Sequence, residues 1–361
     1  MISKLARRVV DMRSDTVTRP TEAMRQAMSR AVVGDDVYGE DPTVMELEKK
    51  GAEVLGKEAC VYVTSGTMGN LASFIAHCDR RGSEIIVGDR QHTYLYEQGG
   101  ASTLAGIHPR VVRNRDDGTL DIQEVMQAIR PCSGADNDDA HYPRTVLVSI
   151  ENTHNECGGV ALPVDYVKNL KSSITSKGLK LHMDGARAGN AAVALGLPLS
   201  KVCEGADSIS LCLSKGLGAP VGTLVAGEGK FISRVRRAKK ALGGGWRQAG
   251  VLAATGLIAL DTMHETLSKD HRLAKHFAQE LNTIKGIRVP RMPQTNLVFF
   301  EVSGISLDDF ASKLKHEHGI LLSAGYGRSE NLVRAAVHRD LSEDDIGAAI
   351  DAVDKIMKHI P

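Results

Sequence analysis

Ser208-Ile-Ser-Leu-Cys-Leu-Ser-Lys-Gly-Leu-Gly-Ala-Pro-Val-Gly222 begins as an apolar, strand-like run and continues into a glycine-rich turn that carries Lys215. An earlier stretch, Leu181-His-Met-Asp-Gly-Ala-Arg187, has the same form, because an apolar run again ends at a charged residue, Asp184. Open α/β sheets bind their ligands at the edge where the carboxyl ends of their strands meet. We therefore expect Asp184 and Lys215 to hold one ligand between them.

The sequence from residue 58 to residue 215 alternates short apolar runs rich in β-formers with helix-like segments. This alternation is typical of an α/β fold with a mostly parallel sheet and helices on both faces. The expected strands are 59–64, 84–88, 110–113, 145–151, 179–184 and 208–214. The expected helices include 67–80, 121–130, 164–177 and 185–195. The polar segment Pro131–Pro143 is expected to be a solvent loop inside this domain.

A different pattern follows a long helical stretch from Ala249 to about Lys285. Strand-like runs at 296–302, 320–323 and 332–337 are combined with helices that begin at Leu307 and Ser342. We expect a large domain with an N-terminal arm over residues 1–250. Residues 251–361 are expected to form a helical connection and a smaller C-terminal α+β domain.

Composition is that of an ordinary soluble enzyme, with 361 residues, 42% hydrophobic and 25% charged residues and a net charge of +1. A near-neutral charge gives little support to a nucleic-acid or membrane partner. The six cysteines form no C-x-x-C pair and no metal-like spacing, so no metal site is expected. The N-terminus lacks the apolar core of a secretory signal, and a cytoplasmic protein is expected.

A lysine and a carboxylate at neighbouring strand ends suit pyridoxal phosphate (PLP). In PLP enzymes the lysine forms a Schiff base with the aldehyde, and the acid pairs with the ring nitrogen. Ser65-Gly66-Thr67 follows an expected strand and opens a helix, where unpaired N–H groups can bind a phosphate. His92 and His154 each lie just beyond an expected strand, at the same edge of the sheet.

Two other kinds of site fit the sequence less well. Gly216-Leu-Gly-Ala-Pro-Val-Gly222 departs from a dinucleotide fingerprint, because its third glycine is one position late and Pro220 stands where a helix should begin. A metal hydrolase needs three or four ligands at a diagnostic spacing, which Asp184 and scattered histidines do not offer.

Four longer motifs point to one family: Met12-Arg-Ser-Asp-Thr-Val-Thr-Arg-Pro20, Asp35-Asp-Val-Tyr-Gly-Glu-Asp-Pro42, Gly243-Gly-Gly-Trp-Arg-Gln-Ala-Gly250 and Leu332-Val-Arg-Ala-Ala-Val-His338. Over nearly its whole length the chain resembles low-specificity L-threonine aldolases, which are PLP enzymes with the aspartate-aminotransferase-like fold (fold type I). It departs from that pattern at Trp246, where relatives often carry methionine, and at Arg339 after His338.

The resemblance implies roles for individual residues. It makes Lys215 the Schiff-base lysine, Asp184 the partner of the ring nitrogen, and His92 the imidazole stacked on the ring. The remaining implied contacts are those to the phosphate (Ser65, Gly66, Thr67), to the phenolic oxygen (Arg187), to the substrate carboxylate (Ser14, Arg187, Arg334) and to a cofactor, own or neighbouring (Lys240, Arg247).

The activity implied is retro-aldol cleavage of L-threonine or L-allo-threonine to glycine and acetaldehyde by a homotetramer. The base for the β-hydroxyl proton is left open between His154, which we favour, His92 and a water molecule. Two alternatives keep the cofactor site: a β-eliminating lyase or racemase of the same fold, and a scaffold that binds the cofactor without catalysis.

Overall fold

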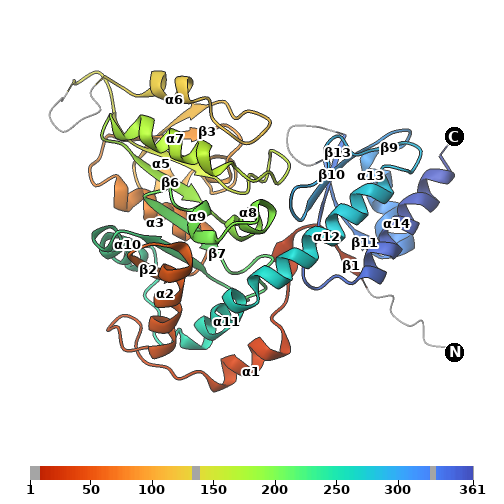
Figure 1. The fold of residues 1–361 in the computed structure, drawn as a ribbon, viewed down its shortest axis with the longest axis horizontal. Coiled ribbons are helices and arrows are strands. Elements are labelled where there is room, and N and C mark those ends of the chain that lie inside the picture. The colour runs from red at the N-terminus through yellow and green to blue at the C-terminus, as the bar shows by residue number, and fades with distance from the viewer. Residues whose placement is uncertain (1–8, 132–138, 326–330, 361) are drawn as a thin grey trace.

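The computed structural model describes residues 9–131, 139–325 and 331–360. Its centre is a seven-stranded sheet with the strand order β2-β8-β7-β6-β5-β3-β4 (Figure 1). The strands are β2 (Ala59–Val63), β3 (Ser83–Gly88), β4 (His108–Val112), β5 (Arg144–Glu151), β6 (Lys180–Asp184), β7 (Ser208–Cys212) and β8 (Thr223–Gly227). The mostly parallel sheet predicted from the sequence is confirmed. Only β8, which was not predicted, runs antiparallel to its neighbours β2 and β7.

Helices cover both faces of this sheet because successive strand residues point to opposite sides. On one face, α3 (Gly66–His77) and α10 (Gly229–Ala241) pack on alternate residues such as Val61 and Val63. On the other face, Cys60 and Tyr62 belong to the largest apolar cluster. The helices that contribute to that cluster include α2 (Pro42–Leu55), α6 (Ile122–Ala128), α7 (Val164–Thr175), α8 (Ala188–Leu195) and α9 (Leu199–Val202).

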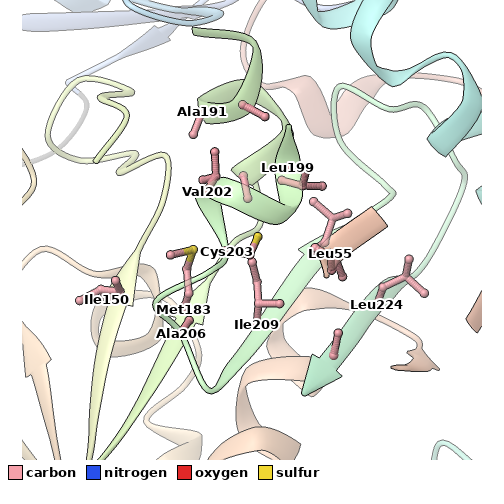
Figure 2. Close-up of a cluster of buried hydrophobic side chains, with 14 of the residues drawn as sticks. Leu55, Ile150, Met183, Ala191, Leu199, Val202, Cys203, Ala206, Ile209 and Leu224 are labelled. Carbon is pink, nitrogen blue, oxygen red and sulfur yellow. The ribbon is translucent and has the colours of Figure 1, made fainter. Parts of the chain in front are cut away.

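Figure 2 shows the packing at the middle of this cluster. The side chains of Leu199 and Val202 on α9 lie over strand residues such as Met183 and Ile209. All four side chains are at most 5% exposed. This apolar layer fixes β6 and β7, the strands that lead to Asp184 and Lys215.

The long helical stretch predicted after residue 249 is two helices, α11 (Gly250–Asp261) and α12 (Met263–Leu281), which meet at Thr262. Beyond them is a four-stranded antiparallel sheet with the order β12-β13-β10-β9. Its elements and neighbours are β9 (Ile287–Arg288), β10 (Leu297–Val302), α13 (Leu307–Lys313), β11 (Ile320–Leu321), β12 (Ser323–Ala324), β13 (Leu332–Ala336) and α14 (Glu343–Lys358). The domain boundary expected between residues 250 and 251 stays a prediction.

The N-terminal segment forms a separate two-stranded sheet with β11 beside this small sheet and then continues to the large one (Figure 1). Strand β1 (Val10–Asp11) pairs in parallel with β11, and the short 3-10 helix η1 (Asp15–Val17) and α1 (Glu22–Arg30) follow. Two one-turn helices, α4 (His92–Leu95) and α5 (Gly100–Thr103), stand between β3 and β4.

Two expectations reach beyond the described residues. Positions 132–138 of the expected polar loop, Cys132 among them, and residues 1–8 of the N-terminus lie outside them. The other five cysteines are buried and free. Within the described part of the chain, no helix is both long enough and apolar enough to cross a membrane.

Candidate active site

The carboxyl ends of parallel strands bring the predicted residues to one edge of the large sheet. Asp184 is the last residue of β6, and Lys215 follows the end of β7. His92 follows β3, and His154 follows β5. One ligand atom each of His92, Asp184 and Glu97 lies within 4.8 Å of the other two, so side chains from separate crossovers meet at this edge.

The Asp184 carboxylate is 2% exposed and held by two neutral donors. The backbone N–H of Ala186 donates to Oδ1 at 3.1 Å, and the Asn70 amide donates to Oδ2 at 3.0 Å. Neither donor carries a charge, so the carboxylate can still pair with a cationic group in the site.

His92 is fixed through its backbone and its ring. Its N–H donates to Oε2 of Glu151 at 2.7 Å, and Nδ1 lies 2.9 Å from Oε1 of Glu97. Burial lowers the pKa of His92, but the hydrogen bond with Glu97 and the charge of Asp184 outweigh it, so the pKa lies above its ordinary value. Burial in turn raises the pKa of the Glu97 carboxyl.

Lys215 sits on a turn that is tied down by its carbonyl. That oxygen accepts hydrogen bonds from Oγ1 of Thr18 and from the N–H of Gly218, both at 2.8 Å. Gly218 has a φ of +80°, a conformation that favours glycine. The amine is close enough for its charge to act on Asp15 and His92.

The predicted phosphate turn caps a helix of twelve residues. Ser65 is the N-cap of α3, and its Oγ accepts the N–H of Met68 at 3.2 Å. Gly66 and Thr67 are the first residues of the helix, so their backbone N–H groups have no partner within it. A helix N-terminus of this kind attracts an anion.

The two predicted arginines have partners that the sequence did not indicate. Arg187 forms a buried bidentate ion pair with Asp15, Nε to Oδ2 at 2.8 Å and Nη2 to Oδ1 at 2.7 Å. Burial works to raise the pKa of Asp15, but the charges of Arg187 and Lys215 hold it well below its ordinary value. Arg334 donates to Oδ1 of Asn155 at 2.9 Å and to the carbonyl of Arg13 at 2.8 Å.

Ser14 follows directly on Arg13, so it lies beside the guanidinium of Arg334. It caps η1, and its Oγ accepts the N–H of Thr16 at 3.3 Å and the Thr16 hydroxyl at 3.0 Å. The N-terminal arm therefore contacts the predicted carboxylate-binding arginine at the residue before Ser14.

His154 is fully buried on the loop that follows β5. Within the described residues, neither of its ring nitrogens has a hydrogen-bond partner. The same loop contacts the other site residues, because Asn155 binds Arg334 and its N–H donates to Oε1 of Glu151, the carboxylate that also holds His92.

Lys240 and Arg247 lie at the end of α10 and in the loop that follows it. Lys240 is exposed at the end of α10. Arg247 is 56% exposed and pairs with Asp35 at 3.4 Å. Their expected contact with a cofactor, in their own or a neighbouring subunit, stays a prediction.

Five residues of the site were missed from the sequence: Asn70, Glu97, Glu151, Asp15 and Asn155. Asn70 gave one signal, since it is a polar residue on a helix whose neighbours Leu71 and Ala72 are buried. Asp15 and Asn155 stand next to predicted residues, but nothing in the sequence indicates their partners, because these depend on contacts between distant segments.

Comparison with known proteins supplies the relationship. A family model of beta-eliminating lyases matches residues 11–304. The chain is 44% identical to a probable low-specificity L-threonine aldolase of Arabidopsis thaliana, with 99% of each chain covered. It is 42% identical to the low specificity L-threonine aldolase of Escherichia coli K12, with 94% of this chain and 96% of the other covered.

Solved structures agree on the fold. A threonine aldolase of Leishmania major superposes with a TM-score of 0.81 over 96% of this chain and 99% of that one. The two sequences are only 17% identical, so the likeness is one of fold.

Proposed function

The chain belongs to the family of low-specificity L-threonine aldolases, and we infer that it cleaves L-threonine and L-allo-threonine between Cα and Cβ. The products are glycine and acetaldehyde. The chain is therefore a carbon–carbon lyase that acts on a small β-hydroxy amino acid and supplies glycine from threonine.

We assign PLP as the cofactor, and the gathering of Lys215, Asp184 and His92 at one sheet edge is the observation that carries this proposal. The donor set fits the group: an amine for the aldehyde, a buried carboxylate for the ring nitrogen, an imidazole for the ring face, and the start of α3 with Ser65, Gly66 and Thr67 for the phosphate. When bound, PLP supplies an electron sink for the pair released as the Cα–Cβ bond breaks.

The chain's own residues orient the substrate. Arg334 and Ser14 would bind the substrate carboxylate, and Arg187, held by its ion pair with Asp15, would bind the same carboxylate and the phenolic oxygen of the cofactor. A planar guanidinium can donate two parallel hydrogen bonds to a carboxylate, which fixes both its position and its orientation. With the cofactor bound, these residues would orient the substrate so that its Cα–Cβ bond, rather than another bond at Cα, is the one that breaks.

The base for the β-hydroxyl proton is His154. A buried imidazole whose two nitrogens lack partners among the described residues costs free energy, and a substrate hydroxyl that donates to one of them removes that cost. His92 is the weaker candidate, because its Nδ1 is already engaged by Glu97 and its ring is expected to stack on the cofactor.

One experiment tests the activity and the cofactor together. Wild type, reduced with borohydride and digested, should yield a cofactor adduct on a peptide that contains Lys215, and Lys215→Ala should lose threonine cleavage. Acetaldehyde release from both diastereomers supports the aldolase. Pyruvate plus ammonia instead of acetaldehyde would identify a β-eliminating lyase, and absorbance near 420 nm without any turnover would identify a scaffold.

The base is tested by paired variants. His154→Phe should lose kcat for threonine by about 100-fold or more, which is the usual contribution of a general base. If His154→Phe keeps a near-normal kcat while His92→Phe loses it, the assignment to His154 is wrong.

A homotetramer is the assembly that we propose, and one face of the chain supports it. The loop before α2 exposes apolar side chains, with Tyr38 77% and Val32 69% exposed. Its neighbours Asp35 and Asp36 bind Arg247 and Lys239. A second copy on this face would cover the apolar residues, and Arg247 and Lys240 of the first copy would then lie toward the cofactor of the second. Sedimentation of the purified protein measures the assembly.

Free buried cysteines support the cytoplasm as the compartment.

A further inference from the structure

A ladder of buried polar side chains lies under Asp184, between α3 and the sheet. His182 and Asp184 are two residues apart on β6, Ser208 and Ser210 are two apart on β7, and each pair therefore faces one side of the sheet. The strand register places His182 opposite Ser208 and Asp184 opposite Ser210. On α3, which packs on this side, Asn70 and His77 are two helical turns apart and share one face.

Hydrogen bonds connect this ladder from end to end. His77 Nε2 lies 2.7 Å from the Ser208 hydroxyl, which lies 2.8 Å from His182 Nδ1. His182 Nε2 lies 3.1 Å from Oδ1 of Asn70, which also accepts the Ser210 hydroxyl at 2.6 Å. These side chains, with the exception of His77, are at most 1% exposed.

The orientation of the Asn70 amide determines which group is the donor in every hydrogen bond of the ladder. Its Nδ2 donates to Oδ2 of Asp184 and to Oε1 of Glu97, both at 3.0 Å. The opposite amide orientation would point Oδ1 at two carboxylates. Since Oδ1 can only accept, His182 must carry its proton on Nε2.

The remaining donors follow from the neutral state of the histidines. Burial above all lowers the pKa of His77 and of His182 to about 3, so each ring has one donor and one acceptor nitrogen near neutral pH. Nδ1 of His182 then accepts from Ser208, and Ser208 accepts from Nε2 of His77. All the donors point toward Asn70 and, through it, toward the two carboxylates.

We propose that Asn70 is a positioning residue for the cofactor ring, held in register by His182, Ser208, Ser210 and His77. Its single amide group orients Asp184, the expected partner of the ring nitrogen, and Glu97, which orients the His92 ring expected to stack on the cofactor. Apolar side chains at the same place would give equal or greater stability. The buried hydrogen-bonded ladder, in which all donors point the same way, is therefore better explained by its orientation of the two carboxylates. The inference rests on the proposed function, because that function gives Asp184 and His92 their contacts with the ring.

The first test measures the protonation of the histidines in this hydrogen-bonded ladder, in protein without cofactor. NMR of the cofactor-free protein, labelled with ¹⁵N in the histidine rings, should find neutral Nε2–H tautomers for His182 and His77 from pH 6 to pH 8. The signals are assigned by their loss in His182→Gln and His77→Gln. A charged ring, or a proton on Nδ1 of His182, would reverse a bond in the chain and overturn the proposal.

The second test reads the effect on the cofactor. Asn70→Leu removes the whole amide. Ser210→Ala removes only the hydroxyl that donates to this amide, so it serves as the test if Asn70→Leu fails to fold. We expect the Kd for PLP to rise about tenfold in Asn70→Leu and a few-fold in Ser210→Ala, as for the loss of hydrogen bonds near charged groups. The pH profile of the visible band should shift in both.

Ser73→Ala is the matched control. Ser73 is a fully buried serine on the same helix, but its hydroxyl donates to the backbone of Gly69 at 2.7 Å and takes no part in the chain. If Asn70→Leu and Ser210→Ala both match this control in the Kd for PLP and in the pH profile of the visible band, the positioning role is wrong. The adduct on Lys215 of wild type would still support the aldolase. Absence of that adduct in wild type would overturn the proposed function and this inference together.

Discussion

Asp270 is a carboxylate in surroundings that disfavour its charge. It lies on α12 beneath the turn that carries Lys215, with Oδ2 4.0 Å from the position that a Cβ on Gly216 would take. The residue is fully buried, and neither carboxylate oxygen has a hydrogen-bond partner among the described residues. Burial raises the pKa of Asp270 to about 8, against the opposing charge of Lys269.

We expect Asp270→Asn to gain stability over wild type as the pH rises from 5 to 8. An unfolded aspartate releases its proton near pH 3.8, whereas the folded protein keeps it up to about pH 8. The unfolding free energy of wild type therefore falls with pH between these values, by at most about 1.4 kcal/mol per pH unit. Asparagine cannot ionise and removes this fall.

Urea unfolding at pH 5, 6.5 and 8 measures the difference, with Asp351→Asn on the exposed side of α14 as the control. A gap between Asp270→Asn and wild type that stays constant over this range would show that Asp270 is already ionised in the fold.

At the scale of elements, the parts visible in the sequence are those that depend on local pattern. The apolar runs and helical segments of the large sheet were predictable because each has its own periodicity. Strand β8 was not, since Thr223–Gly227 directly follows the glycine-rich turn and pairs antiparallel with β7, against the alternation that identified the other strands. The site divides in the same way: Asp184, Lys215, His92 and His154 follow strand ends, whereas Asn70 and Glu97 owe their roles to the packing of α3 on the sheet.

The turn between β7 and β8 gives a prediction at this scale. A Cβ on Gly218 would lie 2.5 Å from Cδ of Arg339, and the Nη1 of that arginine donates to the carbonyl of Leu217 at 2.6 Å. Gly218→Ala should therefore lose about 1 kcal/mol from its positive φ and more from the displaced Arg339. It should also weaken PLP binding several-fold, because the Gly218 N–H holds the Lys215 carbonyl.

Gly178→Ala separates these two costs. Gly178 has a similar φ of +75°, but a Cβ there meets nothing within 4 Å. Thermal unfolding and PLP titration of both variants give the comparison. Equal losses of stability and unchanged PLP binding in Gly218→Ala would mean that the contact with Arg339 has no consequence for the site.

At the scale of the whole molecule, the N-terminal arm joins the two sheets. Val10 and Met12 lie in the apolar cluster of the small sheet, and backbone hydrogen bonds of 2.8 Å join Met12 to Leu321 and Ala336. A few residues on, Asp15 binds Arg187 and Thr18 binds the Lys215 carbonyl of the large sheet. The motif at residues 12–20 was visible in the sequence, but its path was not, because a two-residue strand leaves no periodicity to read.

This path predicts that one apolar side chain of the arm affects both stability and substrate binding. Met12 is fully buried, so Met12→Ala should lower the unfolding free energy by about 2–4 kcal/mol. It should also raise the KM for threonine more than it lowers kcat, because Ser14 and Asp15, the partner of Arg187, follow within the next turn of the chain. Met45→Ala, at a side chain that is 55% exposed, removes the same atoms without a core to disturb. Urea unfolding and steady-state kinetics of the two variants decide the matter, since equal effects at both methionines would mean that the arm is not what couples the small sheet to the site.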